Sequence, residues 1–322
     1  MIDFIRAVLP VHYGLRADAI TQVQGGWSAA AFVVRVDKGM YFAKVYDKHR
    51  PSVQSWIARM PHYMPAVRWL SENTPLRDRM AAPMNTIAGD YKVENNDAIL
   101  LLYPFIDGET LCKAGLSAEQ IRQLADTLAL LHSYGKDIPV PIDAITETYA
   151  LPFMERLSPV SAAKQLPPII APAIDAHVPA IRSAMERLRR LADDMRRNPP
   201  AYALCHTDVH GWNLLWNGSL ILIDWEGLQL APVEADLFTF TDGFFYAEAS
   251  EAFLAAYRKT HPDYAVNQTA MCFYRLRRRL EDIAEFIHSM LHDDLTPSEL
   301  EKNGMHLYKE CTVLERMASE NC

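Results

Sequence analysis

The sequence predicts an α+β fold in two lobes, and three observations support this prediction. The first 107 residues carry short β-branched and aromatic runs broken by glycines, which is typical of a small antiparallel sheet. From Gly108 onward, long stretches with helical periodicity dominate. One apolar hairpin pattern, at residues 214–223, interrupts them. We therefore expect an N-terminal lobe at residues 1–107 and a helical C-terminal lobe at residues 108–322.

The N-terminal part should hold a short helix and several strands. A helix is expected around residues 3–13, and "AITQVQGG" and "AAFVVRVDKGMYFAKVYD" supply three strands. Pro51 opens a helical stretch, which we expect Pro61 and Pro65 to interrupt. Two more strands are expected near residues 84–93 and 98–105.

The C-terminal part should be helical apart from the hairpin. Ser117 and Gln120 have the spacing of a capping box, so a helix should begin there. Further periodic stretches lie at residues 169–197, 234–258 and 268–292, and Thr296-Pro297 with Glu299 begins a last helix.

Composition excludes several classes of function. The net charge is −8, which argues against a general binder of nucleic acid or of anionic membranes. No apolar run is long enough to span a bilayer, and the first residues do not form a secretion signal. The five cysteines form no close pair, which is typical of reduced thiols. We expect a cytoplasmic protein that interacts with neither nucleic acid nor membrane.

The hairpin pattern predicts a metal site at its open end. Asn217-Gly218 between two apolar runs indicates a two-residue turn, which places Asp224 opposite Gly211 and Asn213 opposite Leu222. Asn213 and Asp224 would then be diagonal neighbours on one face, about 7–8 Å apart at their backbones. Their side-chain oxygens could converge on Mg²⁺ at about 2.0–2.1 Å.

Asp208 comes five residues before Asn213 in the irregular segment "CHTDVHGWN". A carboxylate there could accept a proton from a substrate hydroxyl while a metal holds the phosphates of a nucleotide. The spacing His-x-Asp-x-x-x-x-Asn, then a hairpin and an aspartate, is what kinase-type phosphoryl transfer requires.

Zinc is the rival interpretation of the same letters. His206, Asp208 and His210 could bind zinc with Asp224 as a fourth ligand, but Asn213 would then have no role. We assign His206 the structural task of orienting the loop, and His210 remains ambiguous.

The segments "HTDVHGWN" and "LILIDWEG" resemble the aminoglycoside phosphotransferase family, which is related to protein kinases. The resemblance extends to "QGG", "FAKVY", "YPFI", "LAPVEADL" and "YRLRRRLEDIA". It implies a protein-kinase-like fold with Asp208 as the catalytic base and Asn213 and Asp224 as magnesium ligands. It also implies that Lys44 contacts the nucleotide phosphates and that Asp236 is a buried anchor of the catalytic loop.

The other nucleotide contacts rest on weaker patterns. Gly25, Gly26 and Ser28 lie in a turn that could cover phosphates, although such a turn is more often a plain hairpin. The segment from Tyr103 to Phe105 resembles the hinge that pairs with adenine, and nothing there separates ATP from GTP.

Lys44 raises a difficulty for the kinase interpretation. It could instead be a lysine that guards an edge strand against aggregation. Kinase-type sites hold this lysine with a carboxylate from the next helix, yet no acidic residue lies between Asp47 and Glu72. One of those two residues would have to serve, or Lys44 is held differently.

Three carboxylates could bind the acceptor: Glu226, Asp282 and Glu285. Asp282 and Glu285 lie in the helix predicted at residues 268–292. The commoner outcome for such charges is pairing with arginines such as Arg277 or Arg278 at one turn's distance.

The sequence therefore predicts a magnesium-dependent kinase that moves a nucleotide γ-phosphate to a hydroxyl of a small, cationic molecule. An aminocyclitol antibiotic such as spectinomycin is the leading acceptor. The alternatives are a metabolic kinase acting on choline, a sugar or homoserine, a catalytically dead nucleotide-binding relative, and a zinc hydrolase.

Overall fold

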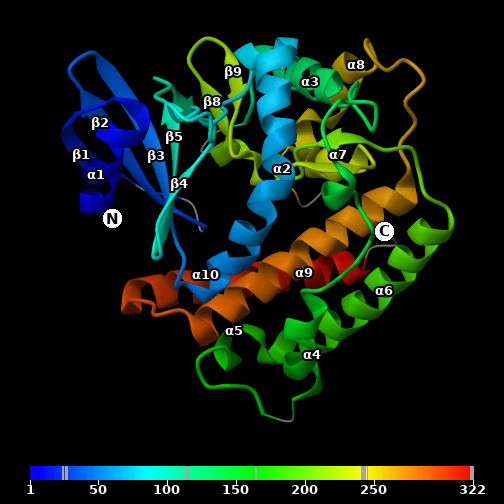
Figure 1. Cartoon of the computed structure of the whole chain (residues 1–322). Coiled ribbons are helices and arrows are strands. Elements are labelled where there is room, and N and C mark those ends of the chain that lie inside the picture. Colours follow the sequence, from blue (N-terminus) through cyan, green and yellow to red (C-terminus); the bar gives the residue numbers. More distant parts are fainter. Residues whose placement is uncertain are drawn as a thin grey trace. The chain divides into compact units, whose positions relative to one another are not determined.

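The computed structural model describes residues 1–23, 25, 28–112, 115–163, 165–240, 244 and 246–319. Figure 1 shows the helices and strands of the chain, coloured along the sequence. The chain divides into two compact units. Unit 1 comprises Met1–Gly115, Pro139–Ile145 and His210–Leu228, and unit 2 comprises Leu116–Ile138, Thr146–Val209 and Gln229–Cys322. The hairpin after Asp208 thus groups with the N-terminal residues, and the predicted lobe boundary after residue 107 stays a prediction.

Unit 1 is built around an antiparallel sheet in the order β1-β2-β3-β5-β4. The strands are β1 (Ala17–Val23), β2 (Ala30–Val36), β3 (Gly39–Asp47), β4 (Val93–Glu94) and β5 (Ala98–Pro104). Helix α1 (Ile2–Tyr13) buries Ile5 and Leu9 in one core with Phe32 and Val34 of β2. This arrangement makes β3 a central strand of the sheet.

Two expectations for unit 1 are wrong. Helix α2 (Gln54–Asn73) runs through Pro61 and Pro65 without ending, because its buried apolar side chains stabilise it despite the lost amide donors. The strand expected at residues 84–93 is mostly a loop, of which only β4 pairs. Within it, Thr86 N donates to Asp90 O at 2.7 Å, closing a turn instead of a ladder.

The hairpin of unit 1 consists of β8 (Leu214–Trp216) and β9 (Leu220–Leu222), with β6 (Glu109–Thr110) beside β8. Trp216 pairs with Leu220, so the turn has three residues and the predicted two-residue turn is wrong. Ser219 N donates to Asn217 Oδ1 at 3.2 Å, and Gly218 has φ 98°. The side-chain hydrogen bond of Asn217 thus supports a longer turn than the letters indicate.

Unit 2 is mainly helical, and its long helices pack on one another. The helices are α3 (Ala118–Leu131), α4 (Met154–Ala162), α5 (Ala171–Ile174), α6 (Val178–Arg197), α7 (Glu234–Leu237), α8 (Ser250–Tyr257), α9 (Gln268–His292) and α10 (Pro297–Ser319). Ser117 and Gln120 form the predicted capping box, and α9 packs against α6 and α10.

Unit 2 also departs from the sequence prediction. The periodic stretches 169–197 and 234–258 are each broken into shorter helices. The hairpin is not the only β-structure after residue 108, because β7 (Ala203–Cys205) pairs antiparallel with β10 (Gln229–Ala231). The mixture of sheets and helices still confirms the α+β class. Among the described helices, none is both long and apolar enough to cross a membrane.

Candidate active site

Lys44 lies on the central strand of the sheet, not on an edge. It pairs with Ala31 of β2 on one side and with Leu101 of β5 on the other. An edge-guard lysine needs an unpaired strand side, so that interpretation of Lys44 is wrong.

Two carboxylates from the end of the hairpin hold the Lys44 side chain. Its Nζ lies 2.6 Å from Asp224 Oδ1 and 3.0 Å from Glu226 Oε1. Burial alone would lower the pKa of the ammonium group, yet Asp224 and then Glu226 hold that pKa above its ordinary value. Lys44 is therefore a charged, fixed group.

Neither carboxylate that the sequence offered as a Lys44 partner is paired with it. Asp47 Oδ1 accepts a hydrogen bond from His49 N at 2.8 Å. Glu72 lies 3.8 Å from Arg68 on the exposed side of α2. The partner missing from the next helix is supplied instead by residues about 180 positions further along the chain. No local pattern could have identified it.

Glu226 is the centre of a cluster of side chains around Lys44, which we call the Lys44 cluster. Its contacts differ from those expected of a residue that binds the acceptor. It accepts hydrogen bonds from Ser28 Oγ at 3.0 Å, from Lys44 and from the Tyr46 hydroxyl. Its burial raises the pKa of the carboxyl group, and the charge of Lys44 opposes that rise. Because these partners all come from the β2–β3 region, the structure places Glu226 beside Lys44.

Helix α2 contributes a phenol to this cluster. It packs against the turn Trp225–Gly227 and buries Tyr63. Burial raises the pKa of Tyr63 well above its ordinary value, and the negative charge of Glu226 adds to the rise. The phenol therefore stays neutral beside the carboxylate.

The turn before β2 contains the predicted phosphate-binding residues. A Cβ on Gly25 would lie 2.8 Å from the carbonyl oxygen of Ala29, so only glycine fits. Gly26 lies outside the described residues. Ser28 is engaged with Glu226, so a role in phosphate contact requires its hydroxyl to exchange partners.

The predicted adenine hinge lies at the end of β5. Tyr103 pairs with Phe42 across the sheet, and Phe105 N donates to Met40 O at 3.3 Å. The amide of Phe105 is therefore already used, which leaves the hinge role of Tyr103 and Phe105 a prediction.

The two predicted metal ligands, Asn213 and Asp224, belong to unit 1. The directions of their side chains do not follow from the predicted alternation of side chains along a strand. Asn213 ends a 3₁₀ turn (Gly211–Asn213), and its carbonyl accepts from Ile223 N at 2.9 Å. Asp224 has φ 66°, a left-handed conformation that is uncommon outside glycine and is typical of functional positions. The irregular backbone at both positions, and not the pleat, sets their side-chain directions.

Gly211 explains how the turn before Asn213 forms. A Cβ there would lie 2.5 Å from the carbonyl oxygen of Leu111 and 2.7 Å from Cys112 Cα. The backbone of residues 111–112 therefore approaches the turn more closely than any side chain would permit. His210 Nε2 lies 3.4 Å from Asn213 Nδ2, which places this ambiguous histidine beside the amide.

The loop that carries Asp208 belongs to unit 2 and is anchored by Asp236. Asp236 accepts backbone hydrogen bonds from His206 N at 2.9 Å and Thr207 N at 2.5 Å. The fully buried His206 accepts from Asp208 N through Nδ1 at 3.3 Å. Thr207 has φ 67°, so the backbone directly before Asp208 is strained and needs these bonds. This is the arrangement that the resemblance implies.

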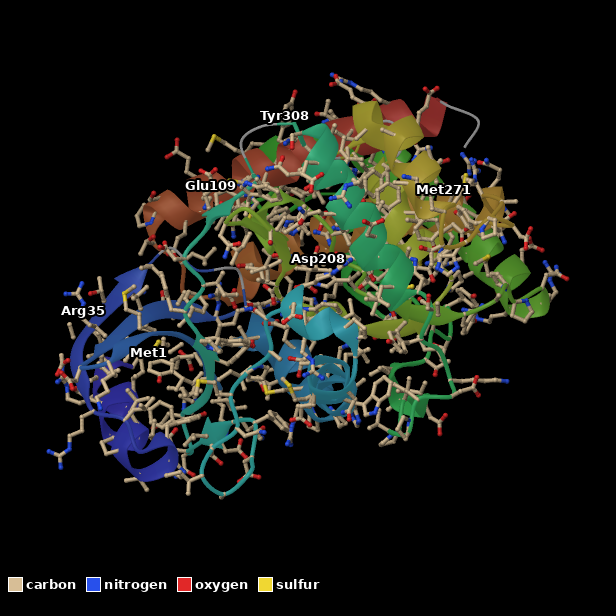
Figure 2. The ribbon with its side chains drawn as sticks, turned by 90° about the horizontal axis from the view of Figure 1, so that it is seen from above. Met1, Arg35, Glu109, Asp208, Met271 and Tyr308 are labelled. Carbon is tan, nitrogen blue, oxygen red and sulfur yellow. The ribbon has the colours of Figure 1, made fainter. Side chains whose placement is uncertain are left out.

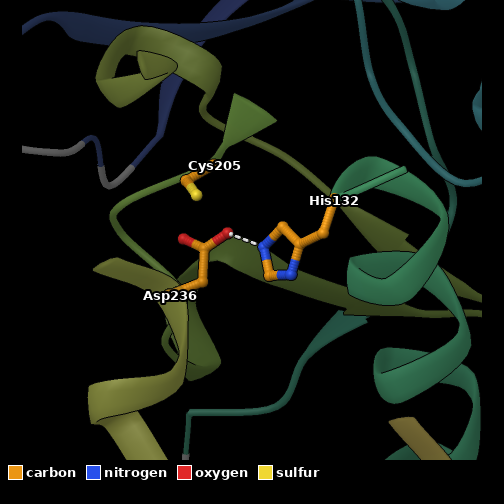
Figure 3. Close-up of side chains that lie close together, drawn as sticks. All are labelled: His132, Cys205 and Asp236. Carbon is orange, nitrogen blue, oxygen red and sulfur yellow. Dashed lines mark hydrogen bonds and ion pairs between the residues drawn. The ribbon is translucent and has the colours of Figure 1, made fainter. Parts of the chain in front are cut away.

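A histidine that the sequence analysis missed completes this anchor (Figure 3). His132, just after α3, has its Nε2 2.9 Å from Asp236 Oδ2 and its Nδ1 2.8 Å from the Tyr257 hydroxyl. The sequence "LLHS" offered no signal for it, because the contact spans about 100 residues.

Cys205 lies beside this pair, and the three side chains have the spacing of a metal-binding group. Burial raises the pKa of the Cys205 thiol well above its ordinary value, so the free thiol stays protonated. His132 and Asp236 are also joined by the hydrogen bond drawn in Figure 3. We interpret the group as a structural support, and it is not the set that the zinc alternative named.

The carboxylate of Asp208, which is labelled in Figure 2, has a cationic partner on α9. Arg278 Nη1 lies 2.5 Å from Asp208 Oδ1, and Arg278 Nε lies 3.0 Å from Asp282 Oδ2. Glu285 is 2.6 Å from Arg156 of α4. Asp282 therefore pairs with an arginine at one turn's distance, as the commoner outcome anticipated, whereas the arginine that pairs with Glu285 comes from another helix.

Comparison with known proteins identifies the family and the fold of this chain. The chain is 25% identical to Protein StrN of Streptomyces griseus over 201 residues, a match that covers 59% of this chain and only 58% of that protein. The fold is similar to the spectinomycin phosphotransferase APH(9)-Ia in complex with ADP and spectinomycin, with a TM-score of 0.70, 20% identity and 97% of each chain covered.

Kinases that act on other small molecules share the fold as well. A microcompartment-associated aminopropanol kinase has a TM-score of 0.69 at 15% identity, covering 99% of this chain and 98% of that one. The choline kinase LicA from Streptococcus pneumoniae has a TM-score of 0.62 at 15% identity, covering 98% and 99%. Residues 19–266 match the phosphotransferase enzyme family, so this chain belongs to that family and has its kinase-like fold.

Proposed function

We propose that the protein is a magnesium-dependent kinase that transfers the γ-phosphate of ATP or GTP to a hydroxyl of a small, cationic acceptor. The observation that carries the proposal is the contact of Lys44 with Asp224. A buried lysine beside the predicted metal ligand is the charge arrangement that nucleotide phosphates require.

The residues of the hairpin fit a magnesium ion. Asn213 and Asp224 offer an amide and a carboxylate oxygen, and hard oxygen donors are the ligands that Mg²⁺ prefers. The ion would offset the negative charge of the phosphates. Lys44 would bind phosphate oxygens in exchange for part of its contact with Asp224.

Asp208 would act as the base. Its loop is fixed by Asp236 and His206, so its carboxylate would accept the proton of the acceptor hydroxyl. The acceptor oxygen then bonds to the γ-phosphorus, and the bond from that phosphorus to the bridging oxygen breaks, releasing the nucleoside diphosphate.

The alternative that the protein is a catalytically dead, nucleotide-binding relative loses its main support. It rested on the absence of a helix carboxylate to hold Lys44, and Glu226 now fills that role. An aminocyclitol such as spectinomycin remains the leading acceptor, since the spectinomycin enzyme shares the fold.

One observation favours a metabolic kinase of small amino alcohols as the second candidate. On α9 and in contact with it, three arginines pair with five carboxylates, a set made up of Arg156, Arg277 and Arg278 with Glu147, Asp208, Glu281, Asp282 and Glu285. Within this set the carboxylates outnumber the arginines by two, and such a modest excess of negative charge suits an acceptor with one or two ammonium groups better than a polycation.

A substrate panel tests both candidates. Purified protein with Mg²⁺ and ATP or GTP would be assayed for nucleoside diphosphate release with spectinomycin, aminoglycosides, choline, aminopropanol, sugars and homoserine. Acceptor-dependent release that is lost in Asp208→Asn supports the proposal. Stabilisation by nucleotide without turnover of any acceptor would contradict it.

A further inference from the structure

Arg278 of α9 reaches the predicted base with its guanidinium. It bridges two carboxylates through different nitrogens, Nη1 to Asp208 and Nε to Asp282. A planar guanidinium held at two points has little freedom to rotate. The Asp208 carboxylate therefore faces a donor of fixed direction.

The anchor of Arg278 is itself rigid. Asp282 lies one turn further along α9, and Leu280, Ile283 and Ala284 of the same turn are fully buried. Asp208 is thus fixed from two directions: its backbone through His206, and its carboxylate through Arg278.

Charge gives Arg278 a second effect on the site. Asp208 and Asp282 both lie within 3.0 Å of one guanidinium. Without that cation both carboxylates would lose their shared positive partner, and neighbouring like charges disfavour the ionised form. A base that must accept a proton has to be ionised beforehand.

We propose that Arg278 is a positioning residue of the transfer reaction, acting through Asp208, and that Asp282 supports it by holding the guanidinium. Arg278 moves no proton and binds no phosphate in this role. The inference rests on the proposed function, because it assigns Arg278 to the base of that reaction.

The test compares four variants in the full chain with the preferred acceptor of the panel. Arg278→Met keeps the length of the side chain without its charge. We expect kcat to fall about 10–100-fold, since small errors in the placement of a catalytic group cost rates of that order. The nucleotide KM should stay within about twofold of wild type, because Lys44 and its partners are unchanged. Arg278→Lys should restore part of kcat.

Arg277→Met is the matched control. Arg277 is the neighbouring residue on α9 and also bridges two carboxylates, Glu147 and Glu281, but it does not contact Asp208. Equal losses of kcat in both variants would mean a general effect of lost ion pairs and would overturn the inference. So would an Arg278→Met enzyme with wild-type kcat.

Asp282→Asn keeps the proposal testable if Arg278→Met does not fold. It leaves Arg278 charged but loosens its anchor, so kcat should fall about 3–10-fold by the same positioning argument. If the wild-type chain phosphorylated no acceptor and hydrolysed no nucleotide, the proposed function would be disproved, and the inference with it. Wild-type turnover with unchanged Asp282→Asn and Arg278→Lys kinetics would end the inference alone.

Discussion

Lys44 shows how much of the site depends on single residues. Its side chain is 16% exposed, and its ammonium group is held by two carboxylates, one on a side chain exposed to about a quarter and the other on a side chain that is nearly buried. A charge in such a position is tolerated only while its partners remain. Lys44 therefore has a structural role in unit 1 as well as its proposed role toward phosphate, and the two roles can be separated.

Lys44→Met should destabilise the protein and weaken nucleotide binding together. Removing one partner of a buried ion pair typically costs about 3–5 kcal/mol, and the partial exposure of Asp224 puts the expected value at the lower end. The nucleotide KM should rise at least about tenfold, a loss of one charge-assisted contact. Urea unfolding and steady-state kinetics measure the two effects.

The double variant Lys44→Met/Glu226→Gln separates them. It removes the uncompensated charge of Glu226, so it should be more stable than Lys44→Met while its nucleotide KM stays high. If the double variant recovered the wild-type KM, phosphate contact by Lys44 would be disproved.

Asp208→Asn should lower turnover about 10²–10⁴-fold, the usual contribution of a general base. The nucleotide KM should change little, because Asp208 does not belong to the Lys44 cluster. Asp193→Asn, an exposed aspartate on α6, is the control for the chemical change itself. Turnover within a few-fold of wild type in Asp208→Asn would remove Asp208 from its role.

At the scale of elements, the structure shows where the local sequence determines the outcome. The capping box at Ser117 and the long helix at residues 268–292 were predicted, because their signals lie within one continuous stretch of chain. The hairpin turn was not, because the Asn217 side chain stabilises a third residue in the turn. The contacts of Glu226 and Arg278 could not be predicted either, since each joins segments 70 or more residues apart.

The 3₁₀ turn before Asn213 depends on one glycine. Gly211→Ala would bring a methyl group within 3 Å of the backbone at residues 111–112, which cannot yield as a flexible side chain would. Overpacking of this kind costs about 1–3 kcal/mol. The turn should shift, and the Mg²⁺ concentration for half-maximal turnover should rise. Gly115→Ala, where a methyl group would meet nothing within 4 Å, should leave both quantities unchanged.

Helix α9 should make stability depend on pH through Asp282. Burial raises the pKa of this carboxyl to about 6 from an ordinary 3.8, and Arg278 opposes the rise. The folded protein therefore binds the proton more tightly than the unfolded chain does, so Asp282 costs stability as pH rises from about 4 to above 6. The shift corresponds to about 3 kcal/mol at most, less whatever solvent screening removes at a side chain that is 26% exposed.

Asp282→Asn has no carboxyl to titrate at this position. The free energy of unfolding of wild type minus that of Asp282→Asn should therefore fall between pH 4 and pH 7. Urea unfolding at pH 4.5, 5.5, 6.5 and 7.5 measures this difference. A difference that stayed constant, or that grew with pH, would show that burial does not raise the pKa of Asp282.

At the scale of the whole molecule, the two units interleave along the chain. The hairpin of unit 1 lies in residues 210–228, which follow two of the three segments of unit 2 along the chain. The change from unit 2 to unit 1 falls between Val209 and His210, inside the segment "HTDVHGWN". A contiguous cut between lobes, as the sequence suggested at residue 107, would therefore separate Lys44 from both of its partners.

A fragment of residues 1–115 should not bind magnesium-nucleotide and should unfold more easily than the full chain. It keeps the sheet and Lys44 but lacks Asp224 and Glu226, so the ammonium group is buried without either partner. It also lacks the backbone bonds from Ala81 N to Leu222 O at 3.1 Å and from Leu222 N to Arg79 O at 2.8 Å, which tie residues 79–81 to the hairpin.

In the full chain, nucleotide at about 100 times its Kd should add about 2.7 kcal/mol to the free energy of unfolding. Thermal unfolding of fragment and full chain, each with and without Mg²⁺ and ATP, gives the comparison. A fragment that ATP stabilises as strongly as it does the full chain would show that the hairpin is dispensable for the nucleotide site, and that Lys44 needs neither carboxylate.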